Sequence, residues 1–95
     1  MAQGVLDFIC RRWHMDSGWK TGNCYWFAKI LTCRFPSLRI YYLPIEGHFI
    51  AGDPIFHIYY DWDGLCYPNE EPIDLEELAD TDPAWYWRLM RDCRD

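Results

Sequence analysis

The chain has 95 residues, of which 51% are hydrophobic and 19% aromatic, and its formal net charge is −6. This composition excludes a mostly disordered chain, because disorder requires low hydrophobicity, and the length fits a single domain over residues 1–95. No apolar run approaches the ~18 residues of a membrane-spanning helix, and the N-terminus lacks the apolar segment and cleavage site of a signal peptide. We therefore expect a cytoplasmic protein without membrane contact.

The charge is distributed unevenly. Residues 1–60 hold six basic and four acidic residues, a net of +2, whereas residues 61–95 hold three basic and eleven acidic residues, a net of −8. The acidic C-terminal third argues against nucleic-acid binding, which needs clustered Lys and Arg. It suits a protein or peptide partner of basic character, although its simplest role is solubility.

The five cysteines are scattered along the chain and never occur with C-x-x-C spacing. An odd number of cysteines without a signal peptide favours reduced thiols over a disulfide framework. The usual ligand spacings of zinc sites are missing as well. We therefore expect no metal and no cofactor.

Two segments of the N-terminal half have apolar residues at helical spacing. The first predicts a helix over about residues 4–14, with Val5, Phe8, Ile9 and Trp13 on one face. The second predicts a helix with Cys24, Phe27, Ala28, Leu31 and Phe35 on one face. Thr21 or Asn23 can cap this second helix, and Pro36 ends it.

Three runs rich in β-branched and aromatic residues follow, at 38–43, 47–51 and 55–62. They predict an antiparallel meander in which the last two strands form a hairpin. A loop over residues 52–57, which contains Asp-Pro, would set His48 opposite Asp61. Asp63 and Gly64 end the predicted sheet.

The C-terminal segment predicts a polar loop at 68–72 and two helices. Asp74 can cap a short helix, and Asp82 followed by Pro83 is a strong helix start. The predicted fold class is therefore α+β, with the helix that carries Cys24 packed on a three-stranded antiparallel sheet, and with C-terminal helices.

Cys24 is the candidate nucleophile. It follows Gly22 and Asn23 at the start of the second helix, where unpaired N–H groups favour a thiolate. Its own N–H is a natural donor to an oxyanion. Because the apolar face of this helix must pack on the sheet, we expect the base to come from a strand. His48 is the best candidate, and Asp61 can hold its imidazole in the correct tautomer.

Each of these assignments has an alternative. Cys24 can be a plain core residue, since free cysteine is among the most buried residue types. His57 competes with His48 as the base, although it falls close to the turn. Asp63 competes with Asp61, although alternation points it to the opposite face.

The residues around these positions resemble a known family. Residues 22–28, with the sequence GNCYWFA, resemble the Gly-x-Cys-x-x-Phe-Ala pattern of transglutaminase-like cysteine hydrolases, which belong with the papain-like superfamily. Gly47-His48-Phe49 and Tyr60-Asp61-Trp62 resemble the histidine and aspartate strands of that family, in the same order. The resemblance covers about residues 19–64, and it implies that the α+β fold has a small papain/transglutaminase-like core.

The resemblance implies amide chemistry through a thioester, as in a thiol protease, a deamidase or an acyltransferase. Cys24 would be the nucleophile, His48 the base and Asp61 the residue that orients the base. The family's side-chain oxyanion donor is not identifiable in this chain. Asn23, Trp19 and Gly47 are the candidate oxyanion or substrate-binding residues.

Two other functions remain open from the sequence. The small size, the acidic tail and the aromatic surface suit a non-catalytic inhibitor that binds another protein, such as a phage-type anti-defence factor. A small-molecule or nucleotide-binding pocket lined by Trp and Tyr is the third hypothesis, although the chain has no Gly-rich phosphate loop.

Overall fold

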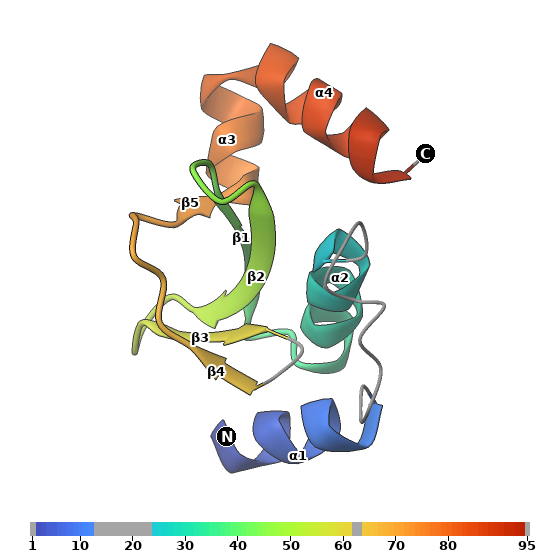
Figure 1. The fold of residues 1–95 in the computed structure, drawn as a ribbon, viewed down its shortest axis with the longest axis vertical. Coiled ribbons are helices and arrows are strands. Elements are labelled where there is room, and N and C mark those ends of the chain that lie inside the picture. Colours follow the sequence, from blue (N-terminus) through green and yellow to red (C-terminus); the bar gives the residue numbers. More distant parts are fainter. Residues whose placement is uncertain (1, 13–23, 62–63, 95) are drawn as a thin grey trace.

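The computed structural model describes residues 2–12, 24–61 and 64–94, which form an α+β fold (Figure 1). The helices are α1 (Ala2–Arg12), α2 (Cys24–Arg34), α3 (Leu75–Thr81) and α4 (Pro83–Arg94). The strands are β1 (Arg39–Leu43), β2 (His48–Asp53), β3 (Ile58–Asp61), β4 (Gly64–Cys66) and β5 (Ile73–Asp74). α2 lies beside β1 and β2, α1 lies near β4, and α3 and α4 stand at the other end of the molecule.

The sheet has the strand order β4-β3-β2-β1-β5, and every pairing is antiparallel. The α+β class and the central meander are confirmed, but the prediction of three strands is wrong because β4 and β5 extend the sheet at its two edges. These edge strands have three and two residues. Segments so short show no alternation of apolar and polar residues, which is the pattern that predicts a strand.

The register between β2 and β3 differs from the predicted one. Ala51 pairs with Tyr60, which is a shift of two residues from the register that sets His48 opposite Asp61. Because successive side chains of a strand point to opposite faces, a shift of two residues leaves every side chain on its predicted face. Asp61 therefore shares a face with His48 and lies diagonal to it across the two strands.

The turn that joins β2 to β3 is shorter than the predicted loop. β2 continues to Asp53, and residues 54–57 make the turn. The Asp53 carboxylate accepts hydrogen bonds from the N–H groups of Ile55 (2.8 Å) and Phe56 (3.2 Å), and the His57 N–H donates to the Asp53 carbonyl (2.9 Å). This turn holds His57 at a φ of 55°, a left-handed conformation that is uncommon for a residue other than glycine.

The two faces of the sheet pack against different groups. The face toward α2 belongs to the main core, which includes Phe27, Ala28, Leu31, Tyr42, Phe49, Ala51 and Tyr60. The opposite face carries a smaller apolar cluster made of Tyr41, Leu43 and Ile50, with Tyr59 and Cys66 packed against it. Side chains on this second face are therefore separated from α2 by the sheet.

The C-terminal helices begin at the predicted caps. The Asp74 carboxylate accepts a hydrogen bond from the Glu76 N–H (2.9 Å), and Asp82 accepts one from the Trp85 N–H (3.2 Å). Arg39 on β1 bonds to Asp74 (2.5 Å) and Glu76 (2.6 Å), which ties α3 to the sheet. None of the helices described here is long and apolar enough to cross a membrane.

Candidate active site

His48 and Asp61 come together on the face of the sheet opposite α2. His48 is the first residue of β2, and Asp61 is the last residue of β3. Side chains diagonal to each other on two antiparallel strands lie about 7–8 Å apart, within reach of long side chains. Burial lowers the pKa of His48, and the negative charges of Asp61 and Glu46 oppose that shift. The imidazole is therefore neutral at pH 7, as a general base must be.

Cys24 is placed by its backbone, as the first residue of α2. The next residue, Tyr25, is buried and its ring meets that of Phe49 edge-on, with 5.5 Å between the ring centroids. Phe49 follows His48 in β2. The first turn of α2, where backbone N–H groups have no partner within the helix, therefore packs beside the start of β2.

Successive side chains of β2 point to opposite faces of the sheet, so His48 does not share a face with Phe49, which contacts Tyr25 of α2. Phe49 belongs to the core on the α2 side, whereas Ile50 belongs to the cluster on the other side. His48 has the same parity as Ile50, so its Cα–Cβ bond points away from α2. The structure thus places His48 and Asp61 on one face of the sheet, diagonal to each other and not directly opposite as predicted. It does not direct the His48 side chain toward the face that α2 covers.

Gly47 has a role in the turn between β1 and β2. Its φ is +66°, a conformation that favours glycine, and its N–H donates a hydrogen bond to the Leu43 carbonyl (2.8 Å). That N–H is therefore engaged within the turn. The other two candidate oxyanion residues, Asn23 and Trp19, lie outside the described residues, as does Asp63.

Cys66 lies on the same face as His48 and Asp61, and the sequence analysis did not connect it with them. It pairs with Tyr59 across β3 and β4. Burial raises the pKa of its thiol to about 12, and the charges of Asp61 and Glu46 act in the same direction. A thiol with this pKa stays protonated at neutral pH, so Cys66 is a poor nucleophile.

The model of one protein family, described as phage YunG-like protein, matches residues 10–89. This chain belongs to the phage YunG-like family. The matched region contains α2, the complete sheet and α3, and thus all three predicted catalytic residues. Neither the comparison with curated proteins nor the comparison with solved structures gives a match. The description of the YunG-like family names no reaction, so the chemistry has to be argued from the residues.

The described part of this YunG-like chain holds no group of three or more His, Cys, Asp or Glu side chains arranged to bind a metal ion. His48 with Asp61 can accept a proton and stabilise the imidazolium that results. The first turn of α2 supplies N–H groups of the kind that stabilise an oxyanion. A thiol-dependent acyl transfer requires a base and an oxyanion donor of these kinds, together with a thiolate.

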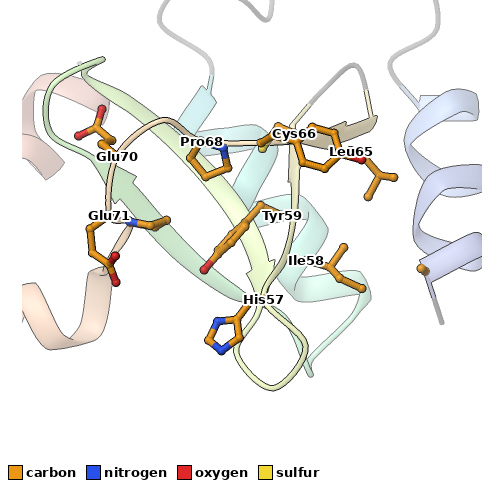
Figure 2. A pocket seen from close by; sticks show the side chains of 11 residues that line it. His57, Ile58, Tyr59, Leu65, Cys66, Pro68, Glu70 and Glu71 are labelled. Atoms are coloured by element: carbon orange, nitrogen blue, oxygen red, sulfur yellow. The ribbon is translucent and has the colours of Figure 1, made fainter.

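A second feature was missed by the sequence analysis. The loop over residues 67–72, predicted only as a polar loop, folds back across the sheet and borders a pocket together with β3 and β4 (Figure 2). Glu70 fixes this loop, because its two carboxylate oxygens accept hydrogen bonds from the N–H groups of Ile45 (2.8 Å) and Glu46 (2.9 Å). The contact between the Glu70 side chain and the turn at residues 45 and 46 joins distant parts of the chain, so local sequence patterns do not predict it.

Proposed function

We propose that this protein is a cysteine-dependent amide hydrolase or acyltransferase that acts on a protein or peptide. Cys24 is the nucleophile, His48 is the general base, and Asp61 orients and stabilises the His48 imidazolium. The observation that carries the proposal is the placement of His48 and Asp61 on one face of the sheet, with the charge of Asp61 acting on a neutral, half-buried imidazole.

The reaction follows from these roles. His48 takes the proton of the Cys24 thiol, and the sulfur attacks the carbonyl carbon of the substrate amide. The imidazolium then gives its proton to the leaving amine as the C–N bond breaks, which leaves a thioester on Cys24. Water completes hydrolysis or deamidation, whereas a second amine completes acyl transfer, and both routes regenerate the thiol.

Proton transfer requires the two reacting side chains to meet at the end of the sheet. His48 begins β2 directly after the turn at Gly47, and its Cα–Cβ bond points to the Ile50 side. The imidazole must therefore reach past the end of the strand toward the first turn of α2. The contact between Tyr25 and Phe49 holds that turn beside the same end of β2.

The alkylation rate of each cysteine against pH tests this proposal. The rates are measured by mass spectrometry in the unmodified protein, in His48→Ala and in Asp61→Asn. We expect Cys24 to react well below the ordinary thiol pKa of about 8.5 and faster than the exposed Cys10 and Cys33. His48→Ala should abolish this advantage, because it removes the base.

The matched control is His57→Ala, which removes the competing histidine and should leave the Cys24 rate unchanged. The catalytic proposal would be wrong if Cys24 reacted no faster than Cys10 and Cys33, or if its rate did not depend on His48. That outcome would favour the alternative function, a non-catalytic protein-binding inhibitor. The observation in favour of this alternative is Trp87, which is 64% exposed on α4 in the acidic C-terminal third.

A further inference from the structure

The pocket on the second face of the sheet has a volume of about 570 Å³. β3 and β4 form its floor, and the 67–72 loop forms one wall (Figure 2). Tyr59 rises from β3 into the space between His57 and Pro68 in this view. A volume of this size is in the range of sites that bind small ligands or single large side chains.

The walls of the pocket are largely apolar. Leu65 and Tyr67 line it while 45% and 82% exposed, and Pro68 and Pro72 complete the wall contributed by the loop. Leaving such apolar surface in contact with water is unfavourable. The walls are therefore suited to a ligand with an apolar stem of several methylene groups.

The charges around the pocket are negative. Glu70 and Glu71 come from the loop, and no Lys or Arg occurs among the described residues that line the pocket. The hydrogen bonds that Glu70 accepts from the β1–β2 turn fix the position of its charge. Glu71 is exposed and lines the pocket together with Tyr59. Burial raises the pKa of the Tyr59 hydroxyl, and the charge of Glu71 acts in the same direction.

Two further carboxylates act on the floor of the pocket. Asp61 and Glu46 both contribute to the raised pKa of Cys66, which lines the pocket. A cation placed against this floor would therefore feel attraction from the loop and from the sheet. Partial exclusion of water by the apolar walls strengthens such an attraction relative to a fully exposed ion pair.

We propose that this pocket binds the side chain of a lysine from a partner protein or peptide, with its methylene stem against the apolar walls and its ammonium group near Glu71. The combination of apolar walls and one sign of charge favours a basic side chain over an acidic or purely apolar one. The proposal does not depend on Cys24 or on the proposed reaction, so either can fail without the other.

The test uses two small probes that differ only in the charged end. Nα-acetyl-lysinamide and Nα-acetyl-norleucinamide, which has a methyl group in place of the aminomethyl end, are titrated into the ¹⁵N-labelled full-length chain. We expect saturable shifts of the backbone amides of residues 57–59 and 65–71 with the lysine probe. The norleucine probe should bind more weakly, and added salt should reduce the difference because it screens the charge.

Glu71→Gln removes one charge from an exposed position and should not disturb folding. It should weaken binding of the lysine probe by about two- to fivefold, the effect of one partly exposed ion pair, without changing the norleucine probe. Glu77→Gln, on the exposed surface of α3 outside the pocket, is the matched control and should bind as the unmodified protein does. Equal binding of both probes, unchanged binding in Glu71→Gln, or no saturable shift at these residues would overturn the proposal.

Discussion

At the scale of single residues, burial and charge act on His48 in opposite directions. Burial lowers its pKa, whereas Asp61 and Glu46 raise it, and the net shift is downward. This balance suits the proposed role of His48 as a base, because a neutral imidazole accepts a proton and a nearby carboxylate then stabilises the cation. It also has a consequence for folding that does not depend on any substrate.

We expect acid to destabilise the protein partly through His48. The unfolded chain binds a proton at His48 near pH 6.5, whereas the folded chain does so only at lower pH, so stability is lost as the pH falls below about 6.5. His48→Gln should remove this contribution. The measurement compares the free energies of unfolding of the two proteins in urea between about pH 5 and 8. Curves that stay parallel across this range would show that His48 has no lowered pKa in the folded state.

The thiols also differ residue by residue. Cys66 is adjacent to two carboxylates and has a pKa of about 12, whereas Cys24 begins a helix, where N–H groups favour a thiolate. Sequence spacing pointed to Cys24 through its neighbours Gly22 and Asn23. It carried no information about Cys66, because the contacts of that residue form only when β4 pairs with β3.

At the scale of elements, Gly52 lets two aromatic rings meet across the centre of the sheet. The rings of Tyr41 and Tyr59 approach edge-on over it, with 5.5 Å between centroids. A Cβ at Gly52 would lie 2.5 Å from Cδ1 of Tyr59 and 3.0 Å from Cε2 of Tyr41. β1, β2 and β3 are thus held in register by a ring pair that only glycine permits at this position.

Gly52→Ala should therefore lower the free energy of unfolding by about 1–3 kcal/mol, the usual cost of overpacking. Gly4→Ala is the matched control, because nothing lies within 4 Å of the added methyl group and the residue is in α1. That substitution should stabilise the protein by about 0.5–1 kcal/mol through helix propensity. Chemical denaturation measures the free energy of unfolding of both variants. Equal changes for the two substitutions would mean that the rings of Tyr41 and Tyr59 do not exclude a methyl group at position 52.

The elements that could be predicted from the sequence are those with local signals. Pro36, Asp74 and the Asp82-Pro83 pair each act on the backbone next to them, and the observed helices end or begin where these residues predict. The register between β2 and β3 was wrong by two residues because Asp53, taken as part of the turn, instead ends β2 and holds the turn with its carboxylate.

The candidate site was predictable to the extent that it depends on strand parity. A two-residue error in register preserves the face, so His48 and Asp61 still share one. Strand parity does not predict whether that shared face is the one that packs against α2. That depends on which apolar residues pack against α2, and both Phe49 and Ile50 are apolar and buried.

At the scale of the whole molecule, one core joins the parts of the chain. The main cluster contains Val5 and Ile9 from α1, Phe27 and Leu31 from α2, Phe49 and Tyr60 from the sheet, Leu75 and Leu78 from α3, and Met90 from α4. A domain of this size buries a modest share of its surface, so each helix depends on the shared core. The pocket and the His48–Asp61 pair lie on the other side of the sheet, where changes disturb this core least.

The shared core predicts one cooperative unfolding transition for the whole chain. Leu31→Ala in α2, Ile9→Ala in α1 and Met90→Ala in α4 each remove a side chain that is at most 2% exposed, and each should cost about 2–5 kcal/mol. Tryptophan fluorescence and far-ultraviolet circular dichroism in urea should give coincident transitions for all three. Ile45→Ala, at a side chain that is 86% exposed, should change stability by less than about 0.5 kcal/mol. Separate transitions for the α1 and α4 variants would mean that the terminal helices fold independently of the sheet, and the single-domain description would then be wrong.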